Sequence, residues 1–106
     1  MGEAPTISTH VLDTELGEPA RGVLVDLYRV LGAVEARVGG GSTDDDGRIR
    51  RVLDGELEPG TYRITFILDG PFFRQASMTF VVDDASRSYH VPLLMSPYSL
   101  ASYRGS

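Results

Sequence analysis

Two histidines and one arginine are the side chains of this sequence best suited to activating water. His10 lies in the segment ISTHVLD and His90 in YHVPLL, and the chain has no other histidine. Arg48 directly follows the turn TDDDG. A neutral imidazole can take a proton from an attacking water, and a guanidinium can stabilise the negative charge that develops on a carbonyl oxygen. Together these residues indicate hydrolysis at a carbonyl carbon.

Each of these residues also has a simpler interpretation. Alternation along the chain places His10 opposite Val11 and His90 opposite Val91, so both imidazoles point outward if the two valines face the core. They could then be ordinary surface histidines on two strands that could be neighbours. All ten basic residues of the chain are arginines, which makes a bias in composition the plain explanation of Arg48.

The aspartate run TDDDG before Arg48 has the composition of a solvated hairpin turn, in which Gly47 suits a positive φ angle. A calcium loop is the alternative. The run lacks the regular oxygen spacing and the downstream bidentate glutamate of an EF hand. We therefore expect a turn without a metal.

The chain ends on a polar tail, YRGS, made of Tyr103, Arg104, Gly105 and Ser106. Polar termini are commonly disordered, and that is the simple interpretation. The alternative is a tail whose phenol, guanidinium and hydroxyl groups bind a ligand. The chain has no cysteine, which excludes thiolate zinc sites and cysteine nucleophiles. It also has no P-loop, dinucleotide fingerprint or nucleophile-elbow motif.

The elements that must position these residues are short strands. Apolar and polar residues alternate in segments separated by Gly, Pro and Asp, and no segment shows a helical period over three turns. We predict seven or eight strands near residues 6–13, 22–30, 33–38, 48–53, 61–68, 77–83, 88–95 and 98–104. At most one short helical turn would fit in PFFRQA. The pattern predicts an all-β fold, an antiparallel sandwich in a single domain over residues 1–106.

Charge and hydropathy exclude some partners. The net charge is −5 and the pI is about 4.8, so the chain lacks the basic surface that binds nucleic acid. It has no apolar run of about 20 residues and no basic-then-apolar leader at its start, so we expect neither a membrane span nor secretion. The expected location is the cytoplasm.

The order of the motifs resembles that of the transthyretin-related 5-hydroxyisourate hydrolases. The shared motifs span nearly the whole chain and are ISTHVLD, GEPARGVLVDLY, TDDDGR, PGTYRITF, YHVPLLMSPYS and YRGS. HVPLL, SPYS and YRGS are the specific ones, because prealbumin-like adhesin modules share the turn and strand motifs. The resemblance implies a transthyretin-like sandwich that forms a homotetramer and hydrolyses 5-hydroxyisourate after urate oxidation. It implies no metal or organic cofactor.

The resemblance also implies roles for the residues that match its motifs. His10, Arg48 and His90 are implied to be catalytic, and either histidine could be the base. The tail residues implied to bind substrate at a subunit interface are Tyr103, Arg104, Gly105 and Ser106.

The chain departs from the family pattern in three places. Ser88 stands where many relatives have a further histidine, the segment 69–76 is shorter than usual, and SLAS replaces the commoner SYST. The family's short helix in that segment is therefore expected to be reduced or absent. Two other functions stay open: a transthyretin-like carrier of small molecules, and a prealbumin-like structural module. Neither explains the histidines together with the tail.

Overall fold

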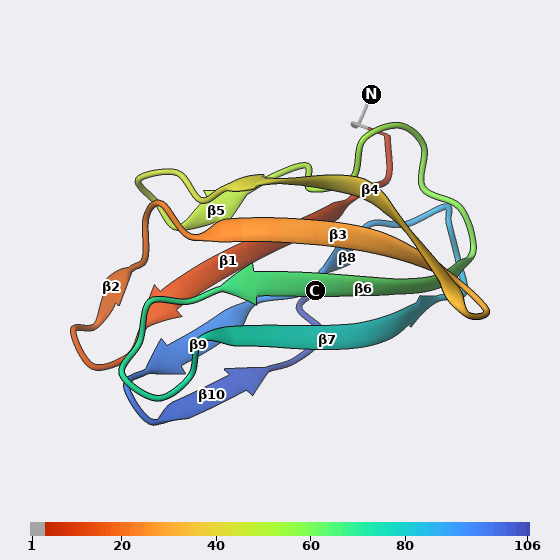
Figure 1. Cartoon of the computed structure of the whole chain (residues 1–106). Coiled ribbons are helices and arrows are strands. Elements are labelled where there is room, and N and C mark those ends of the chain that lie inside the picture. The colour runs from red at the N-terminus through yellow and green to blue at the C-terminus, as the bar shows by residue number, and fades with distance from the viewer. Residues whose placement is uncertain (1–3) are drawn as a thin grey trace.

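A computed structural model describes residues 4–106 as two β-sheets that face each other (Figure 1). The strands are β1 (Ile7–Asp13), β2 (Glu18–Pro19), β3 (Leu24–Leu31), β4 (Val34–Ser42), β5 (Arg48–Ile49), β6 (Gly60–Ile67), β7 (Gln75–Val82), β8 (Tyr89–His90), β9 (Leu93–Ser96) and β10 (Ser99–Ser102). Residues 4–106 form no helix, and so none there is long and apolar enough to cross a membrane. The prediction of an all-β fold is confirmed.

The first sheet is antiparallel and has the order β4-β3-β6-β7. Its inner face carries alternate residues of β3 and β6, as the period of two predicts. Val25 and Leu27 are buried on β3, and Tyr62, Ile64 and Phe66 are buried on β6. Burial of a large apolar side chain stabilises a fold by about 1.5–3 kcal/mol, so this face is a main source of stability.

The second sheet is built around β1, which has hydrogen-bonded neighbours on both sides. β8 and β9 run parallel to β1 along one side, and β5 and β2 run antiparallel along the other. β10 pairs with β9 at the edge of this sheet. Ile7 and Val11 of β1 are fully buried against the first sheet. Thr9 between them is buried as well, so the alternating residues Ser8 and His10 share the outer face of the sandwich.

Two of the predicted strands are shorter in the structure. The predicted strand 88–95 is interrupted after His90, because Pro92 has no N–H to donate to a neighbouring strand. Its two halves, β8 and β9, still pair with β1. Of the predicted strand 48–53, only residues 48 and 49 form a strand, β5. Val52 and Leu53 are consecutive and both buried, which the alternation of a strand does not permit.

The segment between β6 and β7 is a tight loop without a helical turn. The N–H of Leu68 donates to the carbonyl of Arg74 at 2.9 Å and closes this loop. The rings of Phe72 and Phe73 pack edge to face, with centroids 4.8 Å apart. The expected loss of the family's helix is confirmed. A further short strand, β2, was not expected from the sequence.

Candidate active site

The outer face of β1 brings the two histidines and the arginine together. His10 is paired with Arg48 across β1 and β5, and Ser8 is paired with His90 across β1 and β8. Val11 is fully buried and Val91 is 8% exposed, so both imidazoles face outward, as the parity of the strands predicted. The strands that carry the histidines are neighbours. Residues far apart in sequence thus form one cluster.

The aspartate turn holds Arg48 at the start of β5. Asp44 accepts hydrogen bonds from the N–H groups of Asp46 and Arg48, both at 2.9 Å, and these bonds lower the pKa of the Asp44 carboxyl. Gly47 has a φ angle of 76°, and a Cβ there would collide with the carbonyl oxygen of Val11. Only glycine fits this position. The run is a turn that positions Arg48, as the sequence predicted.

His90 is the most constrained side chain of the cluster. Its Nδ1 lies 2.8 Å from Oγ of Ser8, within hydrogen-bond distance. Burial lowers the pKa of His90 below 6.5, and the nearby charges of Arg48 and His10 lower it further. The imidazole is therefore mainly neutral at pH 7, which is the form that can accept a proton. No hydrogen bond to either ring nitrogen of His10 is formed within residues 4–106.

A pocket of about 460 Å³ opens beside this cluster. Its lining residues are Ala4, Thr6, Ser8, Thr9, Arg48, Ile49, Arg50, Ser88 and His90. The lining contains two arginines and no carboxylate, although the whole chain carries a net charge of −5. Such a pocket favours a polar or anionic ligand that presents hydrogen-bond acceptors. Within residues 4–106, no group of three or more acidic or histidine side chains is placed to hold a metal ion.

The sequence did not single out Ser8 and Arg50. The spacing of Ser8, two residues before His10, does place its side chain on the same face, and this was the available signal. Its contact with His90 depends on the pairing of β1 with β8, which spacing does not reveal. Arg50 was not distinguishable from the other arginines of the chain.

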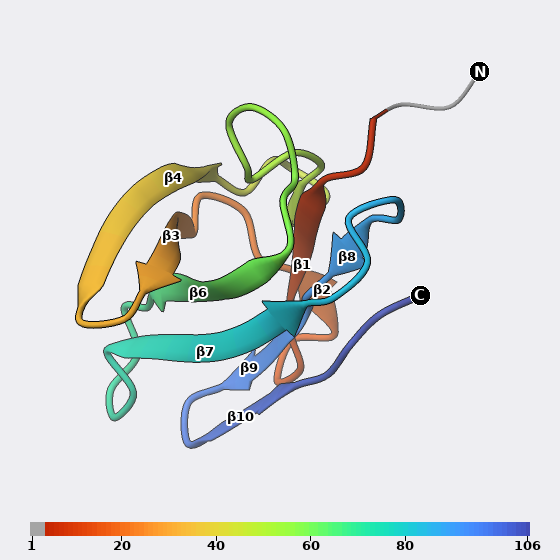
Figure 2. The same ribbon diagram turned by 90° about the vertical axis from the view of Figure 1, so that its right-hand side faces the viewer.

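The tail pairs with β8 through an isolated bridge between Gly105 and His90, and Figure 2 shows the segment that follows β10 running toward the end of the sandwich where β8 lies. The N–H of Gly105 donates to the carbonyl of His90 at 2.8 Å. A Cβ on Gly105 would lie 2.5 Å from Cδ2 of the His90 ring, so the tail backbone packs directly on the imidazole. The guanidinium of Arg104 lies 4.5 Å from the centre of the Tyr89 ring. These contacts order the tail.

The side chains of Tyr103, Arg104 and Ser106 do not line the pocket that contains Arg48. Tyr103 and Arg104 line a separate groove of about 260 Å³ with Met78 and Phe80 of β7. Ser106 is exposed. His90 lines this groove too. Of the four tail residues expected at the site, Gly105 thus packs on His90, and Tyr103 and Arg104 share a groove with it.

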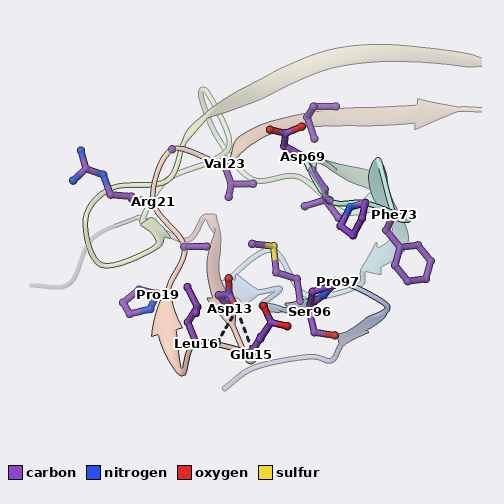
Figure 3. A pocket seen from close by; sticks show the side chains of 17 residues that line it. Asp13, Glu15, Leu16, Pro19, Arg21, Val23, Asp69, Phe73, Ser96 and Pro97 are labelled. Atoms are coloured by element: carbon purple, nitrogen blue, oxygen red, sulfur yellow. Dashed lines mark hydrogen bonds between the residues drawn. The ribbon is translucent and has the colours of Figure 1, made fainter.

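A larger pocket, of about 490 Å³, lies at the other end of β1 (Figure 3). It is formed by the loops around β2, between β6 and β7, and between β9 and β10. Carboxylates of Asp13, Glu15 and Asp69 line it together with apolar side chains such as Phe73 and Pro97 (Figure 3). Its lining contains no histidine, whereas Arg48 and His90 line the smaller pocket. His10 lines neither of these two pockets and is paired with Arg48 across β1 and β5.

A sequence profile of the HIUase/Transthyretin family matches residues 7–105. The chain belongs to this family. Its relatives include the 5-hydroxyisourate hydrolase of Deinococcus radiodurans, which is 42% identical over 119 residues that cover 100% of both chains. The solved structure of the Klebsiella pneumoniae 5-hydroxyisourate hydrolase has a TM-score of 0.82 and 32% identity, covering 96% of this chain and 99% of that one.

The fold also matches that of a solved transthyretin. Sea bream transthyretin, solved in complex with thyroxine, has a TM-score of 0.86 and covers 93% of each chain. Its identity is only 24%, so this likeness speaks for the fold alone. The transthyretin-like sandwich predicted from the sequence is confirmed.

Proposed function

We propose that this chain hydrolyses 5-hydroxyisourate to 2-oxo-4-hydroxy-4-carboxy-5-ureidoimidazoline, the ring-opening step of urate degradation. Relatives that match over their full length are 5-hydroxyisourate hydrolases. The observation that carries the proposal is the cluster on the outer face of β1, where neutral His90 lies beside Arg48 and His10. This cluster supplies a base and a cation, which are the two groups that hydrolysis of a cyclic amide requires.

The reaction begins with the attack of water on a ring carbonyl. A neutral imidazole takes one proton of the water while its oxygen bonds to the carbonyl carbon. The carbonyl oxygen becomes an oxyanion. When the carbon–nitrogen bond of the ring breaks, the imidazolium returns its proton to the leaving nitrogen. The imidazole is then neutral again, and the ring has gained one water.

Arg48 is the group proposed to stabilise the oxyanion. The turn at Asp44 and Gly47 fixes the start of β5, and the pairing with His10 sets the guanidinium on the histidine side of the pocket. A guanidinium presents a planar fork of donors to two oxygens, whereas an ammonium acts as a point charge. Arg50 adds a second positive charge to the same pocket.

We further propose a homotetramer whose active sites lie at subunit interfaces. β7 is one edge strand of the first sheet and β10 is one edge strand of the second, and both lie on the same side of the sandwich in Figures 1 and 2. Unpaired edges are places where a second copy can add its own strands. The tail residues Tyr103 and Arg104 line a groove on this side, so a partner there would contact the tail.

The cytoplasmic location expected from the sequence stays a prediction. Fractionation of the native host cells tests it: recovery of the protein with a periplasmic or secreted marker would contradict it.

The test of function is ultraviolet spectroscopy of freshly generated 5-hydroxyisourate. We expect the absorbance of this compound to decay much faster with the protein than in buffer, and the rate to rise in proportion to protein concentration. A carrier would bind the compound and leave the decay at or below the rate in buffer. That result would reject the hydrolase and favour the carrier.

A further inference from the structure

Ser8 occupies a fixed place beside His90. It lies on β1, which has hydrogen-bonded neighbours on both sides, and its carbonyl accepts a hydrogen bond from the N–H of Val91 at 2.9 Å. Its Oγ lies 2.8 Å from Nδ1 of His90. No other partner of this hydroxyl occurs within residues 4–106. The backbone pairing of β1 with β8 therefore sets the position of the hydroxyl relative to the ring.

The ring of His90 is held from its other edge as well. Gly105 packs against Cδ2, on the opposite side of the ring from Nδ1. Nδ1 and Cδ2 are the two atoms that flank the point of attachment, so these contacts fix the rotation of the imidazole. The distal nitrogen, Nε2, has no hydrogen-bond partner within residues 4–106, and it is not a buried unsatisfied atom. Of the two ring nitrogens, Nε2 is therefore the one available to form a hydrogen bond with a water or a substrate.

A neutral imidazole carries its proton on one of its two nitrogens. The hydrogen bond made at one nitrogen determines whether the other nitrogen is protonated. If Ser8 donates to Nδ1, Nε2 carries the proton and cannot act as a base. If Nδ1–H donates to Ser8, Nε2 has a free lone pair. A serine hydroxyl can do either, because it is both donor and acceptor.

We infer that Ser8 is a positioning residue that accepts the hydrogen bond of Nδ1–H and so makes Nε2 of His90 the general base. The catalytic part of this inference rests on the proposed hydrolase function. In the reaction, water gives its proton to Nε2, and the imidazolium keeps its Nδ1–H bond to Ser8. The proton at Nε2 then passes to the leaving nitrogen, so Ser8 is an acceptor throughout and gains or loses no proton.

The two histidines differ in how their rings are held. Burial, Ser8 and Gly105 hold the ring of His90, whereas no hydrogen bond holds the ring of His10 within the described residues. The base is therefore His90, and His10 remains a neighbour of Arg48.

Three variants test the inference. Ser8→Ala removes the acceptor, and Ser8→Thr keeps a hydroxyl at the same place, with the added methyl group at the rim of an open pocket. Ser77→Ala is the matched control, because Ser77 is a strand serine whose hydroxyl bonds to that of Thr65 at 2.7 Å on the other sheet.

The first readout is the nitrogen-15 NMR spectrum of the histidine rings, recorded without substrate at about pH 8. In the parent protein we expect the proton of His90 on Nδ1, and in Ser8→Ala we expect a shift toward Nε2–H. Ser8→Thr and Ser77→Ala should keep the parent spectrum. A parent protein with the proton on Nε2, or a Ser8→Ala protein with an unchanged spectrum, would overturn the inference.

The second readout is turnover of 5-hydroxyisourate. We expect Ser8→Ala to lose about 10-fold in kcat with little change in KM, a fraction of the 100-fold or more that general base catalysis supplies. Ser8→Thr should restore most of that loss. An unchanged kcat in folded Ser8→Ala would overturn the role of Ser8. A parent protein with no turnover but the expected spectrum would reject the hydrolase function and leave the proton assignment standing.

Discussion

At the scale of single residues, the candidate site combines a half-buried base with an oriented cation. His90 is neutral at neutral pH because burial and two nearby basic side chains lower its pKa. Arg48 is held by the turn that Asp44 and Gly47 form. Arg48 can thus have two effects. Its charge favours the neutral form of His90, and its guanidinium is available to stabilise an oxyanion.

Arg48→Lys tests whether the shape of the cation matters. We expect the variant to fold but to lose about 100-fold or more in kcat, on the order of 3 kcal/mol of transition-state stabilisation. An ammonium cannot reproduce the fork of a guanidinium. Steady-state kinetics measures the loss, and Arg51→Lys is the control, because Arg51 bonds to the carbonyl of Ala4 and is not part of the pocket lining. Near-normal turnover in Arg48→Lys would remove Arg48 from the mechanism.

The pH profile tests the state of His90. The base acts only when it is neutral, so activity should be constant at alkaline pH and fall as the pH drops through the pKa of His90. Since burial, Arg48 and His10 lower this pKa, the midpoint in kcat/KM should lie below 6.5. A midpoint clearly above 6.5 would contradict the environment that the structure gives to His90.

At the scale of elements, the tail packs against one residue of the candidate site. Gly105 bonds to the backbone of His90 and packs on its ring, and Arg104 covers the ring of Tyr89. The tail residues in these contacts are exposed or half-buried, so they contribute little to the core. Their effect is to place the imidazole.

We therefore expect activity and stability to separate when the tail is changed. In Gly105→Ala, the new Cβ meets the His90 ring, and either the ring or the tail must move. A displacement of about 1 Å in a reacting group can cost about 100-fold in rate. Deletion of residues 103–106 should lower the rate at least as much, with a small change in melting temperature. Ala101→Gly, in exposed β10, is the control. Parent-like rates in both tail variants would mean that the tail has no catalytic role.

The elements also show what the sequence could predict. Alternation predicted the buried faces, including Val11 opposite His10, and turn chemistry predicted the turn before Arg48. Alternation could not predict where β5 ends, because Val52 and Leu53 both enter the core. The hydrogen bond between Ser8 and His90 joins residues 82 positions apart in the sequence, and it depends on the pairing of β1 with β8. Local patterns carry no information on such a pairing.

At the scale of the whole molecule, the site is open. A pocket on the outer face of a sandwich excludes little water by itself, and hydrolysis by a positioned water benefits from a closed surrounding. Two unpaired sheet edges on one side, with Val81 of β7 63% exposed, offer a surface that a second copy can cover. The open site and the open edges both support assembly.

We predict that the protein is a tetramer at micromolar concentration. Analytical ultracentrifugation should give about four times the mass of the 11.5 kDa chain. Val81→Arg places a charge on the edge strand β7 and should weaken the assembly, whereas Val34→Arg, on an equally exposed position of β4, should not. A fully active monomer would contradict shared sites.

The most direct measurement of the central claim is the decay of freshly generated 5-hydroxyisourate with the parent protein and with His90→Asn. Asparagine can keep a hydrogen bond to Ser8 but cannot take a proton from water. We predict a fast, protein-dependent decay with the parent chain and a loss of about 100-fold or more with folded His90→Asn. A decay that is the same with both proteins as in buffer would contradict the account.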